Sequence, residues 1–116
     1  MVVYHEAFPT CYLLALAPDA VITTETDLAY HLARACRSGK PAVWVDCRLL
    51  DTLSATAAWL LWSSQQRLRR RGLRLVLCQA SERVQQVLRH TLASVGRGKG
   101  MHLVNTLEDA AALTAA

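Results

Sequence analysis

Residues that could carry out catalysis or hold a metal ion are scattered along this 116-residue chain. The cysteines show no C-x-x-C spacing and the histidines form no H-x-x-x-H pair, so neither residue type predicts a zinc site. All the cysteines lie in apolar runs, where a reduced thiol behaves as a small hydrophobic side chain. We therefore expect buried free thiols at Cys11, Cys36, Cys47 and Cys78, with no metal ion and no cofactor.

Two further patterns suggest anion binding but do not meet its requirements. Three glycines surround Lys99, yet they follow a predicted helix and precede a strand, whereas phosphates bind at the start of a helix. An arginine run covers residues 67–74 and could contact nucleic-acid phosphates. However, most of it falls in the last turn of a predicted helix, where cations stabilise the helix dipole, and no aromatic residues interleave with it. With no cluster of catalytic groups, the sequence predicts a binding module and not an enzyme.

The segment of residues 43–61, VWVDCRLLDTLSATAAWLL, carries the best functional signal in the chain. An apolar strand ends at Asp46, a short loop contains Asp51, and Ser54 is suited to cap the helix that follows. Trp59 and Trp62 make this helix apolar on all sides. One side must face a sheet, and the other faces a neighbouring helix, solvent, a partner or a second copy of the chain.

The elements that position this segment follow from composition and periodicity. Hydrophobic residues make up 53% of the chain and charged residues 19%, a balance typical of one folded domain, here spanning residues 1–116. Strands are expected at residues 2–6, 11–17, 42–47, 73–78 and 101–105, and helices at 25–38, 54–71, 81–95 and from 106 onward. A hairpin turn is expected at residues 8–10, and Thr24 with Asp27 suggests a capping box. The alternation predicts an α/β domain with a central, mostly parallel sheet of four or five strands, and about four helices mainly on one face.

Charge and hydropathy indicate the compartment. The formal net charge is +4, and no apolar stretch reaches the roughly 20 residues that span a bilayer. Residues 1–8 have no basic region of the kind that opens a signal peptide. We therefore expect a cytoplasmic protein that does not bind membranes.

The segment described above resembles the signature of STAS domains (sulphate transporter and anti-sigma factor antagonist). In that family a strand ending in Asp leads through a short loop to Asp-Ser-Ser-Gly at the start of the second helix. Asp46 matches the strand-end residue, and residues 54–57 (SATA) match the four signature positions. Further similarity lies in residues 69–78, in residues 80–88 and in residues 106–111 (TLEDAA).

This resemblance implies a STAS-like fold and a protein-binding role in bacterial signalling, similar to that of an anti-sigma factor antagonist. The implied partner is an anti-sigma factor or a serine kinase of the histidine-kinase-like ATPase type, and a homodimer is a further candidate. STAS domains are switched by phosphorylation of the first signature Ser, but that position is Ala55 here, so Thr56 becomes the candidate phosphorylation site. The residues implied in partner binding are Asp46, Asp51, Ser54, Ala55, Thr56, Ala58 and Trp59. The alternative functions are a basic nucleic-acid-binding domain, which the argument above disfavours, and a small ligand-binding α/β domain.

Overall fold

The computed structural model describes residues 1–18, 25–93 and 102–115. The elements in chain order are β1 (Val2–Ala7), β2 (Tyr12–Ala17), α1 (Thr26–Arg37), β3 (Ala42–Asp46), α2 (Ala55–Arg69), β4 (Arg74–Cys78), α3 (Glu82–Thr91), β5 (His102–Val104) and α4 (Leu107–Ala115). This order confirms the predicted α/β class.

The five strands form one sheet in the order β1-β2-β3-β4-β5. β1 runs antiparallel to β2 through a hairpin, and the other neighbouring strands are parallel. Four of the five residues of β3 are buried and its middle residue is half-buried, as expected for a central strand covered on both faces. The prediction that residues 11–17, 42–47 and 73–78 supply adjacent strands is confirmed.

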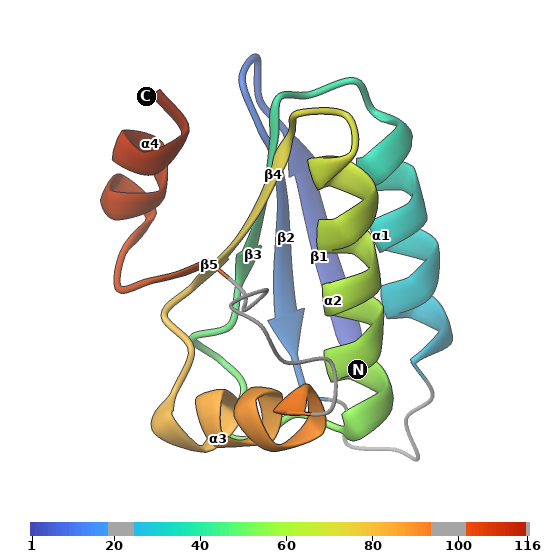
Figure 1. The fold of residues 1–116 in the computed structure, drawn as a ribbon, viewed down its shortest axis with the longest axis vertical. Coiled ribbons are helices and arrows are strands. Elements are labelled where there is room, and N and C mark those ends of the chain that lie inside the picture. The colour runs from blue at the N-terminus through green and yellow to red at the C-terminus, as the bar shows by residue number, and fades with distance from the viewer. Residues whose placement is uncertain (19–24, 94–101, 116) are drawn as a thin grey trace.

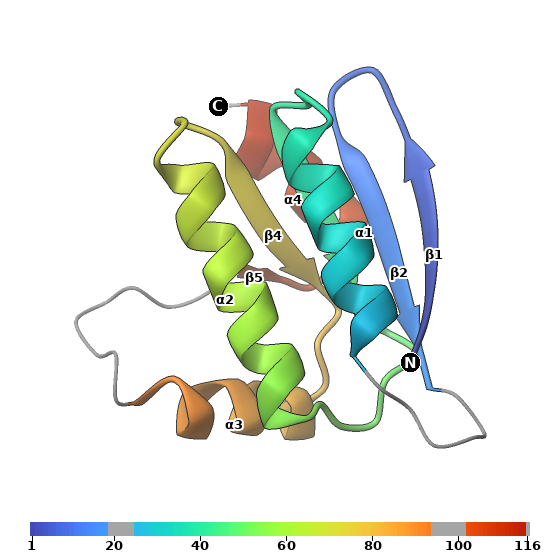
Figure 2. The same ribbon diagram turned by 90° about the vertical axis from the view of Figure 1, so that its right-hand side faces the viewer.

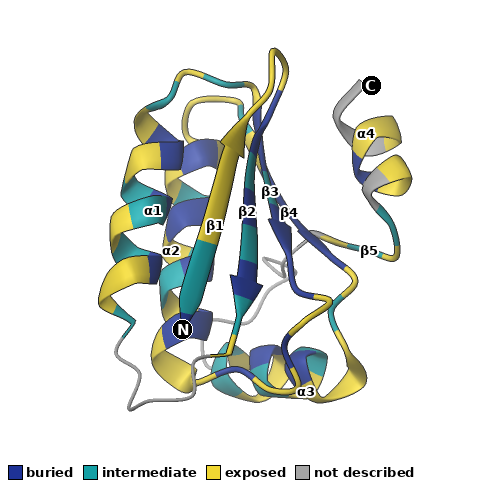
Figure 3. Ribbon diagram, turned by 180° about the vertical axis from the view of Figure 1, so that it is seen from behind, coloured by how far each residue is buried: buried dark blue, intermediate teal, exposed yellow. Residues whose placement is uncertain are grey.

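The helices cover the sheet unequally (Figure 1). α1 and α2 stand side by side on one face, α4 lies on the opposite face, and α3 lies across the end of the sheet (Figure 2). The main core fills the space between the sheet and the pair α1 and α2, and a smaller cluster of Val76, Cys78 and Ala110 lies between β4 and α4. Seen from the α4 side, β3 and β4 are largely buried, whereas the outer strand β1 is mostly exposed (Figure 3). No helix in the described part of the chain is long and apolar enough to cross a membrane.

Serine side chains begin two of the helices. Ser54 accepts a hydrogen bond from the backbone N–H of Ala57 at 3.0 Å, and Ser81 accepts one from Val84 at 3.2 Å. Both contacts satisfy N–H groups that a first helical turn leaves unpaired, and both confirm the predicted caps. The N-cap of α1 is Glu25, whose side chain makes no capping bond, while the expected cap Thr24 lies outside the described residues. The expected glycine-rich loop also lies outside them. The helix predicted for residues 81–95 is shorter in the structure, since α3 ends at Thr91 with Leu92 as its C-cap.

Two groups of titratable side chains stand out, the buried cysteines and a pair of histidines nearer the surface. The four cysteines are free and buried, as predicted, and burial raises the pKa of Cys47 and of Cys78 to about 12. On the α1 side of the sheet, His5 of β1 stacks on His31 of α1, with 4.9 Å between the ring centroids. Burial, assisted by the neighbouring charges of His5 and Arg34, lowers the pKa of His31 below its usual value.

Candidate functional site

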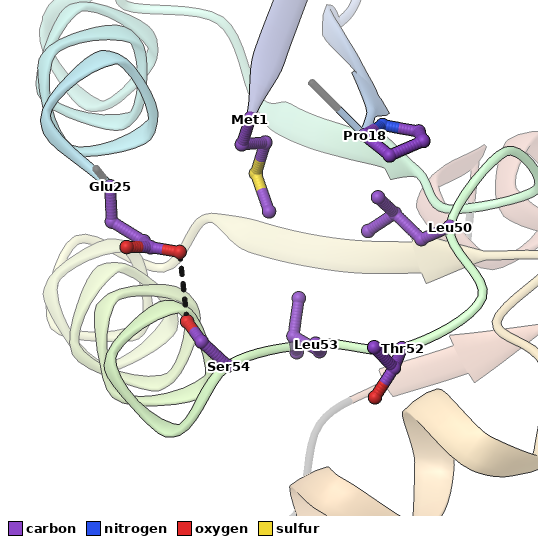
Figure 4. Close-up of a pocket in the computed structure, with 7 residues that line it drawn as sticks. All are labelled: Met1, Pro18, Glu25, Leu50, Thr52, Leu53 and Ser54. Carbon is purple, nitrogen blue, oxygen red and sulfur yellow. Dashed lines mark hydrogen bonds between the residues drawn. The ribbon is translucent and has the colours of Figure 1, made fainter. Parts of the chain in front are cut away.

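The start of α2 is tied to the start of α1 through one serine. Besides capping α2, the Ser54 hydroxyl donates a hydrogen bond to Oε1 of Glu25 at 2.9 Å (Figure 4). The hydroxyl is thus engaged both as donor and as acceptor. The Glu25 carboxylate consequently lies beside the N-terminus of α2, where the helix dipole favours negative charge.

The loop between β3 and α2 is held from two directions. Leu50 and Leu53 are buried in the core, as their apolar character predicts. On the outside, the backbone carbonyl of Asp51 accepts a hydrogen bond from the Ser81 hydroxyl at 3.5 Å, which joins the loop to the start of α3. Leu49 is 53% exposed beside this loop and was not among the expected site residues, because nothing in the sequence separates it from its buried neighbour.

Asp46 supports the loop from inside instead of facing a partner. Its side chain is buried, and its carboxylate accepts a hydrogen bond from the backbone N–H of Arg48 at 3.0 Å. The Arg48 guanidinium lies 3.2 Å from the other carboxylate oxygen. Because both oxygens are occupied, the structure gives Asp46 a positioning role and does not bring it to the surface with the other expected residues.

Ala58 is the clearest correction to the expected site. Its exposed fraction is 0%, and with Ala57 and Leu61 it forms the side of α2 that packs on the sheet. The helical period explains this placement, since residues three and four apart share one face. The expectation that Ala58 contacts a partner is therefore wrong for the folded chain.

The remaining expected residues are exposed and gather around the start of α2. They are Asp51, Ser54, Ala55, Thr56 and Trp59. The Thr56 side chain is exposed and makes no hydrogen bond within the described part of the chain, so its hydroxyl is accessible. The structure thus brings together five of the seven residues on one surface.

A pocket of about 300 Å³ adjoins this surface (Figure 4). Its lining is largely apolar, with Met1, Leu50 and Leu53 pointing toward one another, and Glu25 and Ser54 at its rim. Thr52 and Pro18 complete the lining among the described residues. The pocket fits an apolar side chain better than a reacting substrate, since its lining is largely apolar and the Ser54 hydroxyl, although bonded to Glu25, is already used to cap α2. Within the described ranges, His, Cys, Asp and Glu form no group of three that could hold a metal ion.

Trp59 and Trp62 lie on the side of α2 that is turned away from the sheet. Their rings meet edge to face, with centroids 5.7 Å apart, and Trp59 is 37% exposed. Trp62 is half-buried. Trp59 is therefore not part of the fully buried core, although most of its surface is covered within the chain.

Comparison with known proteins agrees with the fold. The family model of the STAS domain matches residues 7–110. A serine-to-glutamate variant of RsbS from Moorella thermoacetica shares 13% identity at a TM-score of 0.79, with 97% of this chain and 94% of that chain covered. The anti-sigma factor antagonist SpoIIAA in its unphosphorylated form shares 13% identity at a TM-score of 0.73, with 99% of this chain and 98% of that chain covered. The Bacillus cell fate determinant SpoIIAA in the phosphorylated form shares 13% identity at a TM-score of 0.68, with 97% of this chain and 99% of that chain covered. No curated protein sequence matches the chain.

Proposed function

The chain belongs to the STAS family, and from this premise we propose that it is a protein-binding signalling module of the anti-sigma factor antagonist type, without catalytic activity. The observation that carries the proposal is the exposed start of α2, residues 54–56, beside a preformed apolar pocket. A partner can place an apolar side chain in the pocket and cover the polar start of the helix. Such a buried anchor with a polar rim is the usual anatomy of a specific interface.

We further propose that this module lacks the phosphorylation switch that the STAS resemblance implies. The matching position is Ala55, which has no hydroxyl. Ser54 already uses its hydroxyl in two hydrogen bonds, so we expect no phosphate there. Thr56 keeps an accessible hydroxyl, but it lies within the first helical turn, and we expect at most weak phosphorylation. The docking surface then stays in its unphosphorylated, binding-competent state.

The proposed partner is an anti-sigma factor or a serine kinase of the histidine-kinase-like ATPase type. The four free cysteines support binding in the cytoplasm, where thiols stay reduced. A phosphate or carboxylate added to this surface would be stabilised by the helix dipole but would face desolvation when a partner docks. A negative charge at Ala55 is therefore expected to weaken the complex.

The test captures partners from the native host with wild-type protein and with Ala55→Asp, and identifies them by mass spectrometry. The proposal expects a histidine-kinase-like ATPase to be retained by the wild type and depleted with the variant. The same preparation from the host is mapped for phosphate. Stoichiometric phosphate at Ser54, or equal capture of the ATPase by a correctly folded Ala55→Asp variant, would contradict the proposal.

A further inference from the structure

A second surface lies farther along α2, on the side turned away from the sheet. Five residues line a hollow of about 340 Å³ there: Trp62, Ser63, Gln66, Arg67 and Arg70. Their spacing of one, three or four residues places them along the outer side of one helix. In Figure 2 this side of α2 faces the viewer, and no described element crosses in front of it.

The lining of this α2 hollow is rich in hydrogen-bond donors and positive charge. Arg67 and Arg70 contribute two guanidinium groups, and no residue of α2 is acidic. The indole nitrogen of Trp62 and the amide nitrogen of Gln66 are shielded from solvent and have no hydrogen-bond acceptor among the described residues. Two guanidinium groups with no acidic residue on the same helix favour a ligand that supplies hydrogen-bond acceptors and negative charge.

An apolar anchor adjoins the hollow. Trp59 lies about one turn before Ser63 and is 37% exposed, and its ring meets that of Trp62 edge to face. Trp and Arg are the residue types most often found at the energetic centre of protein interfaces. We call Trp59 and the five lining residues the Trp–Arg face.

We propose that the Trp–Arg face binds an acidic segment of a partner protein, with an Asp or Glu carboxylate seated in the α2 hollow. A carboxylate matches the paired donors of an arginine fork, and an apolar side chain next to it packs on Trp59. This inference rests on the proposed function only in taking the occupant to be a protein. The hollow lies farther along α2 than the surface proposed at the start of the helix, and the two surfaces share Trp59, so the contact extends that surface along the helix.

The placement of the arginines favours a protein segment over nucleic acid. Of the run in residues 67–74, Arg67 and Arg70 line the hollow, whereas Arg71 donates a hydrogen bond to the carbonyl of Cys36 on α1 at 2.6 Å. Arg74 lies on β4. The run is thus divided among different surfaces, while a nucleic-acid backbone requires a continuous row of cations along its phosphates.

The experiment selects short random peptides on wild-type protein and counter-selects on Arg70→Glu. The matched control is Arg74→Glu, which makes the same charge change at an exposed residue outside the hollow. We expect peptides rich in Asp or Glu with an aromatic or aliphatic residue. Their affinity should fall about tenfold or more with Arg70→Glu and stay near the wild-type value with Arg74→Glu. Binding should also shift the Trp62 indole N–H resonance.

The outcomes separate this proposal from the one at the start of α2. Arg70 lies 15 residues after Ala55, about 22 Å along the helix, so a failure of Arg70→Glu to weaken peptide binding leaves the test of the first surface intact. The proposal is overturned if no acidic peptide is selected, or if Arg74→Glu weakens binding as much as Arg70→Glu. It is also overturned if a single-stranded oligonucleotide binds instead of acidic peptides and Arg70→Glu abolishes that binding.

Discussion

Replacing Ser54 with alanine removes two contacts at once. The backbone N–H of Ala57 loses its acceptor at 3.0 Å, and Glu25 loses the hydroxyl that donates to it at 2.9 Å. The first contact begins α2, and the second joins the starts of α1 and α2. We therefore expect Ser54→Ala to lower the stability of the whole domain and not only to alter its surface.

The expected size follows from the geometry. Loss of a serine N-cap costs about 1 kcal/mol. The hydrogen bond to Glu25 is solvent-exposed, so its loss adds about 0.2 to 1 kcal/mol. With an unfolding entropy of roughly 2 cal/mol/K per residue, a domain of 116 residues loses about 4 °C of Tm for each kcal/mol. Ser54→Ala should therefore lower the Tm by about 5 to 8 °C.

The assay is urea unfolding followed by circular dichroism, with Thr56→Ala as the matched control. Thr56 also lies exposed at the start of α2, but makes no hydrogen bond within the described residues, so its removal should change stability by less than about 0.5 kcal/mol. Glu25→Gln should cost less than Ser54→Ala, because the amide oxygen still accepts the hydroxyl. Wild-type stability in Ser54→Ala, or an equal loss in Thr56→Ala, would refute the reasoning.

Three further results are expected. Because the pKa of His31 is lowered in the fold, the unfolded chain binds a proton more readily below pH 6.5, and thermal stability should fall as the pH drops through 6.5. His31→Gln should flatten this dependence of Tm on pH, and an unchanged slope would show that His31 is not its cause. Burial raises the pKa of Cys47 and of Cys78 to about 12, so neither thiol should react with a thiol reagent in native protein near neutral pH, and both should react fully after denaturation. Rapid labelling of the native protein at these cysteines would contradict their burial. Ala58→Leu should destabilise the fold by about 1 to 3 kcal/mol and Ala55→Leu by less than about 0.5 kcal/mol in the same unfolding assay, and equal effects would argue against the assigned core face.

The element order could be predicted from the sequence because local signals agreed with one another. Apolar runs marked β2, β3 and β4, and serine caps marked the starts of α2 and α3. Each of these signals depends on residues a few positions apart. Local propensity and capping therefore carry most of the information about where the elements begin and end.

The contact between Ser54 and Glu25 could not be predicted in this way. The two residues are 29 positions apart and meet only because α1 and α2 pack side by side. The role of Asp46 was hidden for a different reason: its partner is local, but an aspartate at a strand end can be either buried or exposed. The structure buries the Asp46 carboxylate against Arg48, whose own side chain stays exposed.

The division of α2 into faces was also unclear from the sequence. Alanines occur at buried and at exposed positions of its first turn, and tryptophans make its outer side apolar, so the hydrophobic pattern has no clear period. The result was the misplacement of Ala58 on the partner surface. Tertiary packing settled the matter, since the small side chains of Ala57 and Ala58 allow the helix to approach the sheet closely.

The central claim is that the start of α2 is a permanently competent docking surface, and a calorimetric titration tests it most directly. A purified anti-sigma factor kinase of the host is titrated into wild-type protein, Ala55→Asp and Ala112→Asp. The last variant makes the same substitution at an exposed position of α4, on the opposite face of the sheet. The account predicts that the wild type binds without prior treatment, that Ala55→Asp binds about tenfold or more weakly, and that Ala112→Asp binds like the wild type. Equal affinities for all three folded proteins would contradict it.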